Sequence, residues 1–249
     1  MIGEIVKDQA IFESLSSQDQ AVVSEMYKAG VHIGHSKSKR HPKMDSFIFA
    51  TRHNISLIDL SKTLSALRSA AVYVKDVVDR GGIVLCVGTN PAIKDLVFNF
   101  AKDLKQPYVV ERWLGGTLTN YKTISKRLDY HEDLSKKHQG GQLEKYTKKE
   151  QLIFSRKLDE LNEKFEGLKL LKRIPDTIFV VDLNRHKAVI DEARKTGVKV
   201  VGVSNTDADP GYVDYPIPAN DNSRSSVGLI LSTLLKMIKD PNFKKEAEK

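Results

Sequence analysis

Short apolar runs alternate along most of the chain with segments in which apolar residues recur every three or four positions. The runs that predict strands cover residues 47–49, 55–58, 83–87, 108–110, 177–181, 198–203 and 215–217. Runs such as 83–87 contain no polar position, which is typical of parallel strands covered on both faces. Strands that alternate with helices in this way predict an open, mainly parallel α/β sheet.

The segments between these runs predict helices. Ser61 is expected to cap one helix, and Asn90 with Pro91 is expected to begin the next, with a cap residue and a proline in the first turn. A further helix from about residue 185 ends at Gly197, because glycine commonly follows the last helical turn. A final helix over about 227–238 has its apolar residues on one face.

The stretch from 120 to 172 contains no strand-like run. Its apolar positions repeat every three or four residues in two halves, at Tyr121, Ile124, Leu128 and His131, and then at Phe154, Leu158, Leu161, Phe165 and Leu168. Gly140 and Gly141 separate the halves, and Thr147 with Glu150 three residues later is a capping-box pattern that would begin the second helix. Two such helices predict an antiparallel coiled-coil helical hairpin inserted into the α/β unit.

This pattern divides the chain into four parts. We expect an N-terminal helical segment over 1–28, a discontinuous α/β domain over 29–119 and 174–240, the hairpin over 120–173, and a tail of mixed basic and acidic residues over 241–249. The total of 249 residues is enough for one such domain with an appendage.

Charge adds a candidate partner to this picture. The chain has 40 Lys and Arg against 32 Asp and Glu, a net charge of +8, which favours a polyanion. Six of the cations and only one acid lie between Lys28 and Arg52. The hairpin region has fourteen Lys or Arg against nine acids, which is compatible with contact to RNA or protein and equally with a solvated face of mixed charge.

The densest cluster of cations, which we call the basic tract, covers residues 36–44 and follows a turn containing Gly30 and Gly34. Closely spaced cations and a rigid proline suit a phosphate backbone better than a small substrate, although an ordinary solvated loop would also have this composition. The residues expected to contact RNA here are Lys37, Lys39, Arg40, His41, Lys43 and Arg52. His32 and His35 have no cysteine partner nearby, so no metal site is expected.

A second candidate region surrounds Trp113, the only tryptophan. Gly115 and Gly116 precede a predicted helix and would leave backbone N–H groups free for an anion, while Arg112 and Lys122 add positive charge. A tight turn with Trp113 as part of the core is the alternative, and the two interpretations are compatible.

Residues 88–90 and 182–184 follow predicted strands where doubly wound sheets bind nucleotides, so a nucleotide- or flavin-binding enzyme is a rival hypothesis. No dinucleotide-binding or P-loop glycine motif is present, and neither are the serine-hydrolase and zinc-protease motifs. We therefore expect no enzyme, cofactor or small-molecule substrate. A third hypothesis is a free assembly factor whose hairpin binds proteins.

The compartment is expected to be the cytoplasm. Cys86 is the single cysteine, no run approaches the length of a membrane span, and no secretory signal is recognisable.

Several separate motifs together resemble one family. They are Ala29–His35, Pro42–Met44 with Phe47–Phe49, Val87–Thr89, Arg112–Gly116 with Leu118–Asn120, Thr147–Glu150, Ile174–Asp176, and Asp207–Pro210 with Val213–Asp214 and Ile217–Pro218. In this order they are similar to the bacterial S2 family, the second protein of the small (30S) ribosomal subunit. The match runs from about Ala29 to Asp240.

The resemblance implies a flavodoxin-like α/β domain with a coiled-coil hairpin of the bacterial type, located between the head and body of the subunit. It implies a non-catalytic ribosome-associated protein that binds small-subunit ribosomal RNA, contacts neighbouring ribosomal proteins and helps dock ribosomal protein S1.

Overall fold

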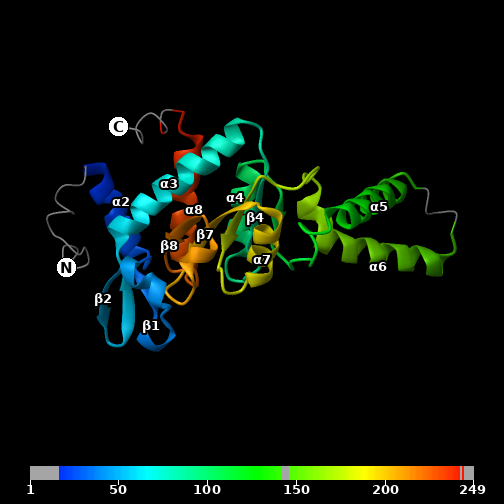
Figure 1. The fold of residues 1–249 in the computed structure, drawn as a ribbon. Helices are drawn as coiled ribbons and strands as arrows, with labels where there is room; N and C mark the ends of the chain where they lie inside the picture. Colours follow the sequence, from blue (N-terminus) through cyan, green and yellow to red (C-terminus); the bar gives the residue numbers. More distant parts are fainter. Residues whose placement is uncertain (1–16, 142–145, 242, 244–249) are drawn as a thin grey trace.

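The fold is an α/β sandwich with a projecting helical hairpin, seen in a computed structural model that describes residues 17–141, 146–241 and 243 (Figure 1). Its main sheet has five parallel strands in the order β5-β4-β6-β7-β8. These strands are β4 (Val84–Val87), β5 (Tyr108–Val109), β6 (Thr177–Val181), β7 (Lys199–Ser204) and β8 (Tyr215–Pro218). This is the flavodoxin-like order, so the predicted fold class is confirmed.

Helices cover both faces of this sheet, and the alternation of side chains explains why its strands are apolar throughout. Val84 and Cys86 belong to one buried cluster, with residues from α2 (Ser17–Lys28), α3 (Leu60–Asp79), α4 (Lys94–Asp103) and α8 (Arg224–Lys239). Leu85 and Val87 face the other way, into a cluster built by α7 (Lys187–Thr196) and the base of the hairpin.

A second, antiparallel sheet has the order β1-β3-β2 and lies at the end of the molecule away from the hairpin (Figure 1). It consists of β1 (Ile33–Ser36), β2 (Ile48–Arg52) and β3 (Ile55–Ile58), and short 3-10 turns, η1 (Lys37–Lys39) and η2 (Pro42–Phe47), connect β1 to β2. The turn predicted at Gly34 was wrong, because Gly34 and His35 lie within β1. Their small and polar side chains give no apolar strand pattern, and the strand forms because β3 offers it a pairing edge.

The hairpin consists of α5 (Tyr121–Gln139) and α6 (Lys148–Phe165), followed by η3 (Glu166–Leu168). Its helices project away from the sheet (Figure 1), and His131 Nε2 lies 2.7 Å from Asn162 Oδ1 between them. The predicted capping box is confirmed, because Thr147 and Glu150 hydrogen-bond each other's backbone N–H. The helical insertion is therefore present, while its coiled-coil packing stays a prediction.

Two predicted helix starts were wrong. The N-cap of α3 is Asp59, whose Oδ1 accepts a hydrogen bond from the N–H of Ser61 at 3.0 Å. In the other case Asn90 Oδ1 accepts from the N–H of Ala92, so the cap residue closes a separate turn and α4 begins only at Lys94. The predicted end of α7 at Gly197 is confirmed, and this glycine has a φ of +73°.

The two edges of the main sheet are protected differently. In β8, Pro216 and Pro218 lack backbone N–H groups, and the carbonyl of Pro218 accepts a hydrogen bond from Thr63 Oγ1 at 2.7 Å. At the other edge, β5 is only two residues long, and Gly167 packs directly on Tyr108. None of the helices in the described segments is long and apolar enough to cross a membrane.

Candidate nucleic-acid interface

The basic tract is attached to the main sheet through Thr206, which follows β7 and is fully buried. The N–H of His35 donates to Thr206 Oγ1 and the N–H of His41 donates to Thr206 O, both at 2.8 Å. A Cβ at Gly34 would lie 2.5 Å from Thr206 Cγ2 and 2.7 Å from Ser56 O, so this position requires glycine. The two bonds fix both ends of the turn that carries Lys37 and its neighbours.

Several cations of the basic tract already have acidic partners. Arg40 Nε lies 2.8 Å from Asp45 Oδ1, and Lys43 Nζ lies 2.8 Å from Asp209 Oδ2. His41 Nε2 is 3.9 Å from the same Asp209 oxygen. The hydrogen bond from Lys43 is the main reason why the pKa of Asp209 lies below its usual value. The tract therefore presents less unpaired charge than its sequence indicates.

Lys37 and Lys39 differ from these neighbours. Both are exposed, and neither forms an ion pair within the part of the chain that the structure describes. Backbone bonds hold the turn beneath them, since the N–H of Lys37 donates to the carbonyl of Asn54 at 2.9 Å. Arg52 is exposed at the end of β2, opposite Ile55 of β3. The structure thus brings the six predicted contact residues of this region to one end of the molecule.

The histidines near the tract have structural partners. His32 stacks on Tyr27 with ring centroids 4.6 Å apart, and burial lowers its pKa. His35 Nε2 lies 3.3 Å from Asn222 Nδ2 and 3.6 Å from Asp207 Oδ2. The turn before them contains Gly30, with a φ of +73°. Among the residues that the structure describes, no group of three His, Cys, Asp or Glu is placed to hold a metal ion.

The loop around Trp113 does bind a carboxylate, but one from the same chain. Glu192 of α7 accepts hydrogen bonds from Trp113 Nε1 at 3.0 Å and from the N–H of Gly116 at 2.9 Å. Its other oxygen accepts from the N–H groups of Leu118 and Thr119. The expectation that these N–H groups are free for an external anion was therefore wrong.

Glu192 is buried, yet it remains ionised at neutral pH. Burial alone would raise its pKa, but the hydrogen bonds from Trp113 and from the loop amides outweigh this effect and leave the pKa below the usual value. Gly115 is exposed at the tip of the loop, and Gly116 has a φ of +88°. Sequence reasoning missed Glu192 because nothing in a helical segment marks one acid as the partner of a distant loop.

In the structure, the two cations of the second predicted contact region lie at different elements of the fold. Arg112 and Lys122 are both exposed, Arg112 just beyond β5 and Lys122 in the first turn of α5. Arg112 lines a pocket beside β5 that also contains Glu111 and Glu163, so its surroundings are acidic rather than basic. Neither residue lies near the basic tract, whose anchor Thr206 is at the other side of the sheet.

Related sheets bind nucleotides at the carboxyl ends of the strands that correspond to β4 and β6. Here the backbone groups at these ends are hydrogen-bonded to His186. This histidine accepts a hydrogen bond at Nε2 from the N–H of Thr89 at 3.2 Å, and its Nδ1 donates to the carbonyl of Asp182 at 2.7 Å. His186 is buried, and this burial lowers its pKa, so the ring is neutral. The Thr89 amide, a natural phosphate donor in this fold, is thus already used.

A buried acid lies close to the same edge of the sheet. Asp221 is only 4% exposed, and its Oδ1 accepts a hydrogen bond from Asn205 Nδ2 at 3.1 Å. Burial, together with the nearby charges of Asp182 and Asp207, raises the pKa of Asp221 to about 7. A substantial fraction of this carboxyl is therefore protonated near neutral pH.

Comparison with known proteins shows what this architecture is similar to. The protein named "Small ribosomal subunit protein uS2" from Thermus thermophilus is 41% identical over 219 residues, which cover 88% of this chain and 86% of the relative. The proteins of the same name from Bifidobacterium longum and Acidothermus cellulolyticus are 39% identical over 220 residues and 41% identical over 209 residues. They cover 86% and 84% of this chain, and the matches span 77% and 76% of these relatives.

These matches define the class as ribosomal proteins of the small subunit. The family model described as "Ribosomal protein S2" matches residues 26–240. The chain belongs to the ribosomal protein S2 family.

Proposed function

We propose that the chain binds small-subunit ribosomal RNA through the basic tract and has a structural, non-catalytic role in the subunit. The observation that carries this proposal is the placement of Lys37 and Lys39, which are exposed without an acidic partner in the described chain, on a turn fixed at both ends by Thr206. A preordered pair of cations neutralises phosphate with little loss of conformational freedom. Membership of a family of small-subunit ribosomal proteins makes ribosomal RNA the natural polyanion.

The remaining predicted residues would join this contact after exchanging partners. Arg40 and Lys43 would leave Asp45 and Asp209 for phosphates, and Arg52 and His41 would extend the surface around them. Contacts of this kind recognise the shape of folded RNA more than its bases.

Arg112 and Lys122 form a proposed second contact, at the junction between the α/β domain (29–119 and 174–240) and the hairpin (120–173). In the assembled particle the protein would support subunit assembly and help dock ribosomal protein S1. This role requires no cofactor, and it places the protein on ribosomes in the cytoplasm. The names of the relatives, as proteins of the small subunit, support a place in that particle.

The test measures binding to a small-subunit ribosomal RNA transcript at several salt concentrations. For the double variant K37A/K39A we expect the slope of log affinity against log salt to fall by about 1.4 to 1.8, the contribution of two phosphate contacts. The matched control is K187A/K195A, which removes the same charge from exposed positions on α7. A slope equal to that of the wild type in K37A/K39A would exclude these lysines from the interface.

A second experiment tests the role in the cell. The full chain should sediment with small subunits in a sucrose gradient at one copy per particle. A chain that stays at the top of the gradient in growing cells would instead support the free assembly factor.

A further inference from the structure

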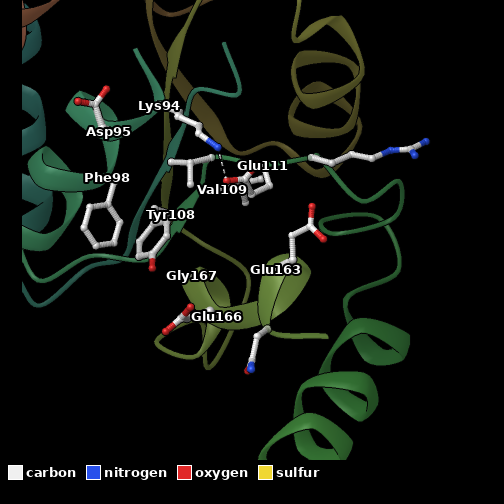
Figure 2. Close-up of a pocket in the computed structure, with 12 residues that line it drawn as sticks. Lys94, Asp95, Phe98, Tyr108, Val109, Glu111, Glu163, Glu166 and Gly167 are labelled. Atoms are coloured by element: carbon white, nitrogen blue, oxygen red, sulfur yellow. Dashed lines mark hydrogen bonds and ion pairs between the residues drawn. The ribbon is translucent and has the colours of Figure 1, made fainter. Parts of the chain in front are cut away.

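A pocket of about 340 Å³ lies where the base of the hairpin meets the β5 edge of the sheet. Figure 2 shows Lys94, Tyr108 and Glu111 on the side of the sheet domain and Glu163 and Glu166 on the side of the hairpin. The pocket is separate from the basic tract, because β5 and β7 are three strand spacings apart, roughly 14 Å, and the tract is attached beyond β7.

The inner wall of the pocket is aromatic. The rings of Phe98 and Tyr108 meet edge to face, with centroids 5.0 Å apart and an angle of 90° between their planes. Lys102 Nζ already lies 5.9 Å from the centroid of the Phe98 ring. Aromatic faces attract Lys and Arg cations, so this wall is suited to a further cationic side chain with an apolar stem.

The charges around the pocket are mainly negative, although the chain as a whole has a net charge of +8. The lining contains four acids and two bases, which are Asp95, Glu111, Glu163, Glu166, Lys94 and Arg112. Lys94 is paired with Glu111 at 2.7 Å, and Asp95 is paired with Arg224 of α8.

Unlike Asp95 and Glu111, the two acids on the hairpin side of the pocket have no ion-pair partner within the described segments. These two acids, Glu163 and Glu166, are exposed. After burial, the charge of Glu166 is the second cause that raises the pKa of Tyr108, which shows how near this acid is to the aromatic wall. Two unpaired carboxylates at one pocket repel phosphate and attract a cation.

Within the part of the chain that the structure describes, the backbone beside the pocket has unpaired hydrogen-bonding groups. Val110 lines it directly after β5, and in the described chain neither its N–H nor its C=O has a hydrogen-bond partner. A peptide in extended conformation could bond to these groups while its side chains enter the pocket. The phosphates of RNA would instead meet the two free carboxylates of Glu163 and Glu166.

We propose that this pocket docks a protein segment that carries an arginine or lysine, contributed by a neighbouring protein in the particle. The cation pairs with Glu163 or Glu166, and its methylene stem packs on Phe98 and Tyr108. This inference goes beyond the RNA contact proposed for the basic tract and does not depend on it, since the pocket contains no residue of that tract. The pocket does contain Arg112 of the proposed second contact, so a docked peptide and RNA would compete at this residue.

The test is a titration of the full ¹⁵N-labelled chain, followed by NMR, with two synthetic pentapeptides. One is acetyl-Gly-Val-Arg-Val-Gly-amide, and in the other glutamine replaces the arginine. We expect the arginine peptide to shift the amide signals of Tyr108, Val110 and Gly167, and to bind at least fivefold more tightly than the glutamine peptide. The double variant E163Q/E166Q should remove this difference.

The matched control is D159N, which removes a charge from an exposed position one helical turn before Glu163. It should leave the binding of the arginine peptide unchanged. Thermal melting of each variant checks that it is folded.

Equal binding of the two peptides, or an absence of shifts at the pocket, would overturn the proposal. So would displacement of the arginine peptide from these amides by a short RNA hairpin, which would make the pocket an RNA site. Concentration-dependent shifts of the same amides without peptide would indicate a second copy of the chain as the occupant and would equally reject it. None of these results depends on the lysines tested for RNA binding.

Discussion

The indole N–H of Trp113 donates a hydrogen bond to Glu192 at a distance of 3.0 Å and so joins the loop before the hairpin to α7. The same carboxylate binds the backbone of Gly116, Leu118 and Thr119. One side chain thereby satisfies the amides that lead into α5. Glu192 therefore connects the loop that leads into the hairpin to α7.

Replacing Glu192 with Gln should lower the free energy of unfolding by about 2–4 kcal/mol, because an amide has one acceptor oxygen and its NH₂ group would face the donors of the loop. Chemical denaturation at pH 7 measures this change. The control is D191N, an exposed neighbour on the same helix, which should change stability by less than about 0.5 kcal/mol.

The same substitution has a defined pH dependence. The pKa of Glu192 is lower in the folded protein than in the unfolded chain, so its ionised form contributes stability above pH of about 4.3 and this contribution is lost as the pH falls through the folded pKa. The difference in stability between wild type and E192Q should therefore shrink in acid. A difference that stays constant from pH 7 to pH 3 would contradict this role of the charge.

Asp221 should have the opposite pH dependence. Its folded pKa of about 7 lies above its unfolded value, so the folded state favours the protonated acid and stability falls as the pH rises from about 4 to 8. The substitution D221N replaces the acid with a permanently neutral group. It should stabilise the protein at pH 8 by up to about 4 kcal/mol and have little effect at pH 4. Denaturation curves at the two pH values decide this, and equal effects at both would show that Asp221 does not titrate as described.

Gly34 should tolerate no side chain. The substitution G34A places a methyl group against Thr206 Cγ2 and the carbonyl of Ser56, and we expect a loss of about 1–3 kcal/mol in stability. G115A is the control, because a Cβ at Gly115 meets no atom within 4 Å. Thermal unfolding of both variants tests this, and two equal melting temperatures would show that β1 can move away from Thr206 without cost.

Removing the acid that binds Lys43 should strengthen RNA binding. In D209N the ion pair is lost while an oxygen remains to accept from the N–H of Gly211, so Lys43 becomes available to phosphate. The slope of log affinity against log salt should steepen by up to about 0.9. The added substitution K43A should reverse the gain, and a gain that persists in D209N/K43A would assign it to general charge instead.

The sequence predicted the sheet well because its strands are covered on both faces. Runs such as 83–87 and 178–181 contain only residues that packing requires to be apolar, so the pattern and the structure have the same cause. The capping box at Thr147 was predictable for a similar reason, since both of its hydrogen bonds lie within four residues of chain. The start of α4 could not be predicted in this way, because Asn90 makes the same side-chain bond whether it caps a helix or an isolated turn.

The position of the candidate site could be predicted from the sequence, but the pairing of its charged side chains could not. The basic tract is visible in the sequence as a cluster, whereas the partner of Lys43 is Asp209, 166 residues further along the chain. No local pattern reports such a contact. The same holds for Glu192, which is 79 residues from Trp113 and acts as the anion that the loop had been expected to bind from outside.

The prolines of β8 have a consequence for the protein before it joins a particle. A ribosomal protein is synthesised as a free chain, and open strand edges are the usual places where such chains associate into aggregates. Here Pro216 and Pro218 withhold donors at one edge, and the other edge is two residues long and lies against Gly167. Apart from the backbone groups of Val110 just beyond β5, the sheet therefore offers little open edge to a foreign strand, so free chains have few places at which their sheets could associate.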